Sequence, residues 1–170
     1  MLEIGKKIGA KSEATLPSMT APDTPFTNIR IIRNAIEACR GFLYWVDKYF
    51  AVSDLDILMD ALEKADVKDV KILISLKSAD EKMRSYFKRF KEEMENKGIV
   101  CEMRVVVDSK IYGEYHDRWL ISSNICYNLM SGEVAKRGQY AEIKSSENRP
   151  PFEEWWQNSL DVISRWDDIR

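Results

Sequence analysis

Three short apolar runs, each joined to the next by a segment with helical periodicity, constrain most strongly what this chain can fold into. The runs are residues 42–46, 70–76 and 99–107. Residues 42–46 are wholly apolar, and the other two runs are mostly apolar. Such short apolar runs are typical of buried strands, and helices between buried strands are typical of parallel crossover connections. The chain is therefore predicted to be an α/β protein with a buried central sheet.

The segments around these runs predict the rest of the architecture. Apolar residues recur at helical spacing between residue 28 and Gly41, and Ser53 and Ser78 are expected to begin two further helices. The helix after Ser78 is predicted to place five apolar residues on its core face, namely Met83, Tyr86, Phe87, Phe90 and Met94. Later segments are predicted to form two more strands and a final helix, at residues 115–122, 139–143 and 152–166. The result is a mixed sheet flanked by helices on both faces.

The length of 170 residues suits a single domain of this kind. Residues 1–26 are rich in Lys, Ser, Thr and Pro without periodicity, so we expect a flexible arm there and the α/β domain over residues 27–170. No transmembrane segment or signal peptide is recognisable. The three cysteines lack metal-binding spacing, which predicts buried, reduced thiols, no metal site and a cytoplasmic protein.

The candidate site begins at His116, the only histidine of the chain, which lies two residues before Arg118. Residues two apart in a strand project from the same face, so both side chains are predicted to point into one site. An imidazole beside a guanidinium suits a phosphate group. The net charge of −2 argues against coating nucleic acid through long-range attraction, so any phosphate site must be local.

Other candidate ligands of a phosphate lie where predicted strands end. Asp47, Lys48 and Lys77 follow the first two apolar runs. Open α/β sheets place their ligand crevice outside the carboxyl ends of the strands, which makes these residues candidates. Asn124 is a further candidate. For all four, a simple loop or turn role is the competing interpretation.

The stretch EYHDRWLISSNICYNLMSGE resembles one half-motif of the phospholipase D superfamily, H-x-K-x-x-x-x-D followed six residues later by G-S-x-N. In this register His116 takes the histidine position, Arg118 the lysine and Ser131 the serine, while the aspartate is lost. The stretch FLYWVDKYF is similar to the superfamily's strand ending in Asp-x-Tyr, which extends the resemblance over residues 27–144. The resemblance implies a phospholipase D-like fold.

The resemblance also implies a chemistry in which one histidine attacks phosphorus and a second protonates the leaving oxygen. A chain with one histidine would need a homodimer for this, and Glu142 is the expected partner that orients His116. Arginine in place of lysine favours binding over turnover, so we expect a catalytically degenerate domain that binds a phosphodiester of nucleic acid or of a phospholipid headgroup, without a cofactor.

Two alternatives stay open at this point. One is an active, metal-independent phosphodiesterase or nuclease that works as a homodimer through a phosphohistidine. The other is a membrane-associated adaptor that recognises anionic phospholipid. Phospholipid, DNA and RNA present similar phosphates, and no base-reading motif is visible in the sequence.

Overall fold

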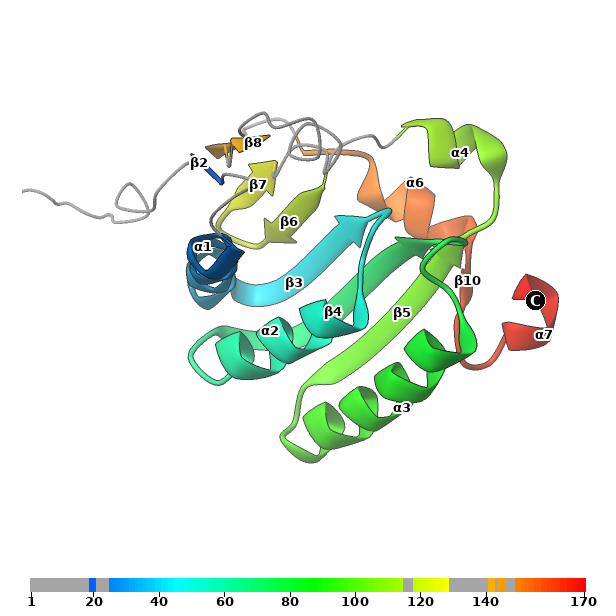
Figure 1. Cartoon of the computed structure of the whole chain (residues 1–170), viewed down its shortest axis with the longest axis horizontal. Coiled ribbons are helices and arrows are strands. Elements are labelled where there is room, and N and C mark those ends of the chain that lie inside the picture. Colours follow the sequence, from blue (N-terminus) through cyan, green and yellow to red (C-terminus); the bar gives the residue numbers. More distant parts are fainter. Residues whose placement is uncertain (1–18, 21–24, 115–117, 129–140, 143, 146–148) are drawn as a thin grey trace, which may run out of the picture.

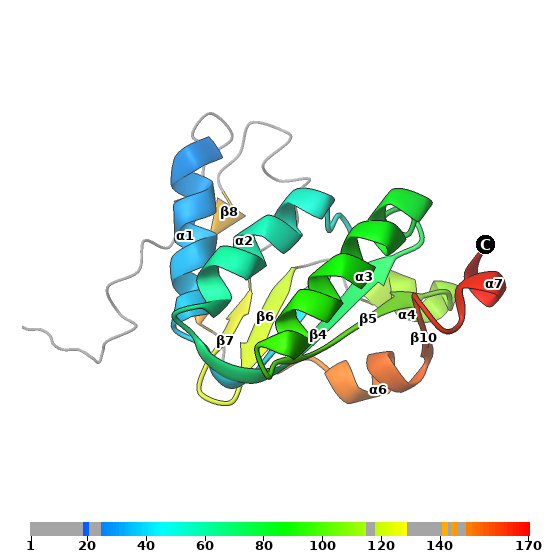
Figure 2. The same cartoon turned by 90° about the horizontal axis from the view of Figure 1, so that it is seen from below.

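Seven strands form one mixed sheet, and helices cover both of its faces (Figures 1 and 2). The strand order across this sheet is β10-β5-β4-β3-β6-β7-β9. The computed structural model describes residues 19–20, 25–114, 118–128, 141–142, 144–145 and 149–170. The predicted fold class, an α/β protein with a mixed sheet between helices, is therefore confirmed.

The elements of the main sheet follow one another along the chain with helices between them. Its strands are β3 (Arg40–Asp47), β4 (Asp66–Ser75), β5 (Val100–Val106), β6 (Trp119–Ser122), β7 (Cys126–Asn128), β9 (Lys144–Ser145) and β10 (Ser159–Asp161). The helices are α1 (Pro25–Glu37), α2 (Val52–Leu62), α3 (Glu81–Asn96), α4 (Ser109–Glu114), α6 (Phe152–Gln157) and α7 (Trp166–Ile169). A separate two-stranded sheet pairs β2 (Met19–Thr20) with β8 (Ala141–Glu142).

The three apolar runs form the parallel centre of the sheet. Strand β4 pairs in parallel with β3 on one side and β5 on the other, and α2 and α3 provide the crossovers. Helices cover both faces of these central strands, so side chains pointing either way are buried, as with Ile72 and Leu73. This explains why consecutive apolar residues occur in each run. The prediction of three buried strands in these positions is confirmed.

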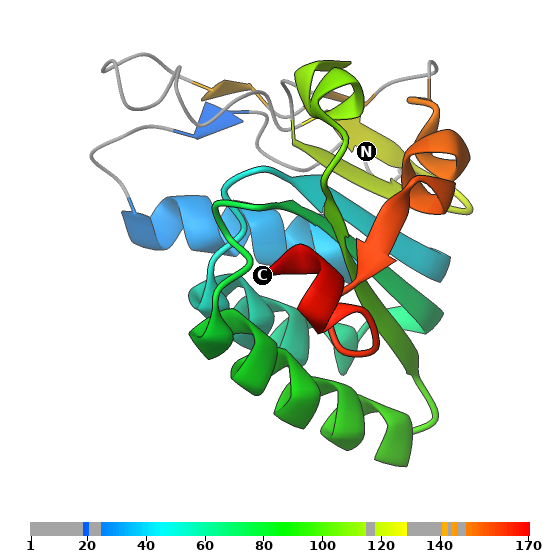
Figure 3. The same ribbon diagram turned by 90° about the vertical axis from the view of Figure 1, so that its right-hand side faces the viewer.

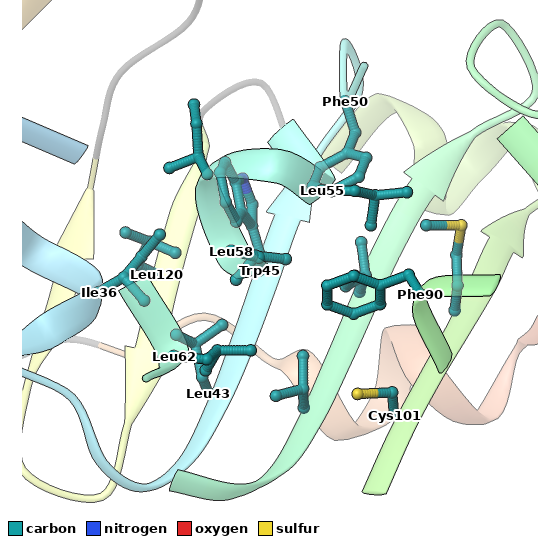
Figure 4. Packing of buried hydrophobic residues seen from close by; sticks show 14 of the residues in the cluster. Ile36, Leu43, Trp45, Phe50, Leu55, Leu58, Leu62, Phe90, Cys101 and Leu120 are labelled. Atoms are coloured by element: carbon teal, nitrogen blue, oxygen red, sulfur yellow. The ribbon is translucent and has the colours of Figure 1, made fainter. Parts of the chain in front are cut away.

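The main hydrophobic core lies between the sheet and helices α1, α2 and α3. Trp45 is fully buried and meets Phe50 edge to face, with ring centroids 5.1 Å apart. Leu58 of α2 and Phe90 of α3 pack onto the same core (Figure 4). Four of the five residues predicted for the core face of α3 are buried there, whereas Tyr86 is 41% exposed. Tyr86 was therefore wrongly placed in the core by the sequence pattern.

The opposite face carries a smaller aromatic cluster under α6, the orange helix of Figures 1 and 3. Phe152 of α6 stacks on Tyr44 at 4.5 Å and on Trp156 at 5.6 Å. Lys71 and Arg104 lie 5.3 Å and 4.6 Å from the Trp156 ring centre. These cation contacts allow charged residues of β4 and β5 to lie beneath the aromatic side chains of α6.

The C-terminal region differs from the single helix predicted for residues 152–166. Helix α6 ends at Gln157, and β10 then pairs antiparallel with β5, with Ser159 opposite Val106. The pairing occurs because the outer edge of β5 would otherwise present unpaired N–H and C=O groups. A second helix, α7, follows. The helical spacing of the aromatic residues therefore predicted a helix where the structure has a short strand.

Smaller corrections concern helix starts and edge strands. The residue that caps α3 is Asp80, whose carboxylate accepts a hydrogen bond from the Met83 N–H at 2.8 Å, and Ser78 does not begin the helix. The strand predicted over residues 115–122 is described only from Trp119. Of the strand predicted over residues 139–143, Ala141 and Glu142 form β8, which pairs with β2 outside the main sheet.

Candidate functional site

The loops after β3 and β4 meet at the carboxyl edge of the sheet, where the arrowheads of both strands point in Figure 1. Side-chain hydroxyls join the two loops. Ser75 and Ser78 both donate hydrogen bonds to the backbone carbonyl of Lys48, at 2.6 Å and 3.0 Å. The edge is thus a connected surface of the kind that binds ligands in open α/β sheets.

An ion pair lies at this edge between Asp47 and Arg118. Strand β6 runs antiparallel to β3 with Trp119 opposite Val46, which brings Arg118 next to Asp47. The Arg118 Nε donates to Asp47 Oδ2 at 3.0 Å, and Asp47 Oδ1 accepts from the Tyr49 N–H at 2.8 Å. Arg118 thus lies at the carboxyl edge, and its charge is matched by a buried carboxylate.

A second carboxylate adds to this cluster. Asp54, in the first turn of α2, accepts a hydrogen bond from the Ala51 N–H at 2.8 Å. Burial raises the pKa of Asp54 from 3.8 to about 6, and the negative charge of Asp47 acts in the same direction. The Ala51 N–H and the Arg118 guanidinium act in the opposite direction. Two carboxylates around one guanidinium do not form an anion-binding site at neutral pH.

The histidine and the serine of the proposed motif, His116 and Ser131, lie outside the described residues. Glu142 lies in β8, in the small sheet with β2, and its side chain is also outside the description. The contact between Glu142 and His116 therefore stays a prediction, as does the phospholipase D resemblance itself.

Asn124 was wrongly predicted to belong to the site, because it lies at the opposite end of β3 from Asp47. Its Oδ1 accepts from the Arg40 N–H at 3.0 Å, and its Nδ2 donates to the Ala38 carbonyl at 3.1 Å. Asn124 thus joins the turn between β6 and β7 to the start of β3. This is the turn role that competed with the ligand role in the sequence.

A cleft with a volume of about 590 Å³ opens at the carboxyl edge between the N-terminal ends of α2 and α3. We call it the carboxyl-edge cleft. It is lined by Phe50, Ala51, Val52, Ser53, Asp56, Lys77, Ser78, Asp80, Lys82, Met83 and Tyr86. Among the predicted site residues that the structure describes, only Lys77 lines it. The positions that reasoning from the sequence missed, such as Ser53 and Tyr86, are brought together only by the crossovers.

Exposed cations continue from this cleft along α3. Lys77 and Lys82 line the carboxyl-edge cleft, and Arg89 lies over the Tyr86 ring at 4.9 Å. Two other cations of the helix have carboxylate partners: Lys91 pairs with Glu95 at 2.6 Å, and Arg84 lies 3.6 Å from Glu81. Lys88 is also exposed, but it is not among the residues that line the cleft.

The buried thiols carry no chemistry at neutral pH. Cys39, Cys101 and Cys126 are free and buried, as predicted. Burial raises the pKa of the Cys39 and Cys101 thiols to about 12, so both stay protonated and unreactive. Within the described part of the chain, no three histidine, cysteine or carboxylate side chains gather as a metal site. No helix found there is long and apolar enough to cross a membrane.

Comparison with known proteins finds similar solved structures but no family. Neither a protein-family model nor a curated protein sequence matches the chain. The structure of TrmBL2, an archaeal chromatin protein described with a novel mode of DNA binding, is similar with a TM-score of 0.54 and 13% identity. The match covers 86% of this chain and 54% of that one. The chain thus spans about half the length of this neighbour and shares its fold.

The neighbour corrects the function expected from the sequence. The similar fold belongs to a DNA-binding chromatin protein, and not to a phosphodiesterase or a lipid adaptor. The expected phospholipase D-type phosphodiester site was therefore wrong, as were its two alternatives, the dimeric phosphodiesterase and the phospholipid adaptor. The physical reason is visible at Arg118, whose guanidinium is bound to the buried carboxylate of Asp47.

Proposed function

We propose that this chain is an α/β domain of a DNA-binding protein and that it takes part in DNA binding. The observation that carries the proposal is the structural match to the DNA-binding chromatin protein over 86% of the chain. Because that protein is about twice as long as the matched region, the chain serves as one part of a larger DNA-binding unit.

The surface best suited to DNA is the rim of the carboxyl-edge cleft. Lys77 and Lys82 line the cleft, and Arg89 lies close to it because the Tyr86 ring that it contacts also lines the cleft. All three cations are exposed. Ammonium and guanidinium groups bind backbone phosphates without reading sequence. With an overall charge of −2, the chain has no long-range field to attract DNA. Binding through this rim is therefore weak, insensitive to sequence and sensitive to salt.

Fluorescence anisotropy with a short labelled duplex at low salt tests the proposal. The double variant Lys77→Glu/Lys82→Glu is expected to bind about tenfold more weakly or worse and to show a smaller dependence on salt. The matched control is Lys64→Glu/Lys97→Glu, which makes the same charge change on exposed residues at the C-terminal ends of α2 and α3. This control is expected to bind nearly as well as the unmodified chain.

Two results would contradict the proposal, each in a different way. Equal loss in both double variants would show that only overall charge matters and would remove the rim from the proposal. Absence of duplex binding by the unmodified chain at low salt would remove DNA contact by this domain altogether.

A further inference from the structure

The carboxyl-edge cleft combines two kinds of wall. Part of its lining is polar and holds Lys77, Ser78 and Lys82, which we call the polar wall. Another part holds the rings of Phe50 and Tyr86, which we call the aromatic wall. Its volume of about 590 Å³ lies within the range of small-molecule sites, which is roughly 300 to 1,000 Å³. It also lies outside the carboxyl ends of two adjacent parallel strands, the usual position of a ligand in this architecture.

The polar wall has cations that are available to an anion. Within the described residues, neither Lys77 nor Lys82 has a carboxylate partner. Asp80 also lines the cleft, but its carboxylate caps α3 by accepting from the Met83 N–H at 2.8 Å. The exposed carboxylate of Asp56 is the remaining acceptor, and it suits the hydroxyls of a sugar.

The aromatic wall has one ring that is open to a planar ligand. Tyr86 lines both the carboxyl-edge cleft and a smaller cavity of about 250 Å³, whereas Arg89 lines only the smaller cavity. Arg89 lies over the Tyr86 ring at 4.9 Å, so it covers the side that faces the smaller cavity. The face of the Tyr86 ring toward the cleft is left for a planar ligand to stack on. Phe50 is 2% exposed and fixed edge to face against Trp45, so it forms a rigid floor (Figure 4).

We propose that the carboxyl-edge cleft binds one nucleotide unit. The phosphate lies between Lys77 and Lys82, with the Ser78 hydroxyl as a donor, and the base stacks on Tyr86. A nucleotide presents an anion at one end and a planar ring at the other, which matches the two walls, whereas inorganic phosphate uses only the polar wall. Base stacking on an aromatic side chain is a recurring mode of nucleotide recognition.

Two kinds of ligand present such a nucleotide unit: a free mononucleotide, and one nucleotide of a DNA strand. The second source rests on the proposed DNA binding, while the first does not. Calorimetric titration of the unmodified chain with AMP, ribose 5-phosphate and inorganic phosphate tests the cleft directly. AMP is expected to bind about tenfold more tightly than ribose 5-phosphate because only AMP carries a base. In the second part of the experiment, the same chain is titrated with single-stranded and duplex oligonucleotides.

Three variants separate the two walls. Tyr86→Leu is expected to abolish the preference for AMP and to leave phosphate binding unchanged, while Tyr86→Phe keeps the preference. Lys77→Ala/Lys82→Ala is expected to lose all three small ligands, with Lys97→Ala as the control at the far end of α3. All of these positions are exposed, so the variants are expected to fold.

Each outcome decides one claim. Equal binding of AMP, ribose 5-phosphate and phosphate, unchanged in Tyr86→Leu, would show a simple anion site and overturn the nucleotide proposal. Duplex binding that depends on Lys77 and Lys82, without AMP binding, would overturn the cleft proposal and leave the proposed function standing. AMP binding without any oligonucleotide binding would support the cleft as a mononucleotide site and remove the proposed function.

Discussion

Arg118 and Asp47 form an ion pair across β3 and β6, with Arg118 Nε 3.0 Å from Asp47 Oδ2. The side chain of Asp47 is 2% exposed and that of Arg118 is 22% exposed. The pair therefore holds the start of β6 to the end of β3 and neutralises a carboxylate that water cannot reach. A buried charge of this kind becomes strongly destabilising when its partner is removed.

Replacing Arg118 with Ala is expected to lower the free energy of unfolding by about 2 to 3 kcal/mol, because Asp47 is then buried without a counter-charge. The double variant Asp47→Asn/Arg118→Met is expected to recover most of this loss. Urea denaturation measures both. Arg165→Ala, which breaks an exposed pair with Asp168 at 2.7 Å, is the control and is expected to cost less than about 0.5 kcal/mol. Equal losses at the two sites would contradict the burial argument.

The raised pKa of Asp54 predicts how stability changes with pH. Its pKa is about 6 in the folded chain and 3.8 for the ordinary group, so the folded state binds the proton more tightly. This contribution is fully present below pH 3.8 and is lost as the pH rises through about 6. Its size is roughly 2 to 3 kcal/mol.

Asp54→Asn is expected to remove this part of the pH dependence, since the amide does not ionise while its oxygen still accepts from the Ala51 N–H. The measurement is the free energy of unfolding between pH 4 and pH 7, values that bracket the pKa of about 6. Asp56→Asn, an exposed neighbour on α2, is the control and should leave the curve unchanged. A curve that falls as steeply in Asp54→Asn as in the unmodified chain would exclude Asp54 as the cause.

Two glycines with nearly equal φ angles allow the cost of backbone strain to be separated from the cost of a steric contact by a new methyl group. Gly41 has a φ of +80° and Gly98 a φ of +82°. A Cβ at Gly41 would lie 2.9 Å from the Ser123 Oγ, whereas nothing lies within 4 Å of one at Gly98. Gly98→Ala is therefore expected to lower the free energy of unfolding by about 1 kcal/mol, the cost of a left-handed backbone conformation for alanine. Gly41→Ala is expected to cost more.

The contact with Ser123 makes this comparison decisive. The Ser123 hydroxyl donates to the Arg40 carbonyl, so it is not free to move away from a new methyl group. Thermal or urea unfolding of the two alanine variants gives the difference. Equal destabilisation at the two positions would show that Ser123 yields without cost.

The aromatic cluster under α6 is expected to hold that helix on the sheet. Trp156 is 2% exposed, stacks on Phe152 and lies beneath two cations. Trp156→Ala is expected to lower the free energy of unfolding by about 3 kcal/mol or more. Tyr86→Ala, at an exposed aromatic position on the other face, is expected to cost less than about 0.5 kcal/mol. A small effect at Trp156 would mean that α6 is held mainly by the pairing of β10 with β5.

The sequence alone determined the centre of the fold, because each central strand has enough apolar side chains to be recognised locally. β3, β4 and β5 lie where the three apolar runs are, and α2 and α3 lie between them. The alternation of such segments permits few arrangements other than a parallel sheet with crossover helices. Burial of the three thiols was predicted because their spacing does not suit a metal site.

Only the tertiary structure decided the edges of the sheet and the site. Strands β7 and β10 have three residues each, which is too short for a period, and β10 exists because the edge of β5 offers hydrogen-bonding groups. The pairing of Arg118 with Asp47 joins positions 71 residues apart, and the hydrogen bond from Arg40 to Asn124 joins positions 84 apart. Local patterns carry no information on such distant contacts, so whether a charged side chain faces a ligand or a buried partner is settled only when the chain has folded.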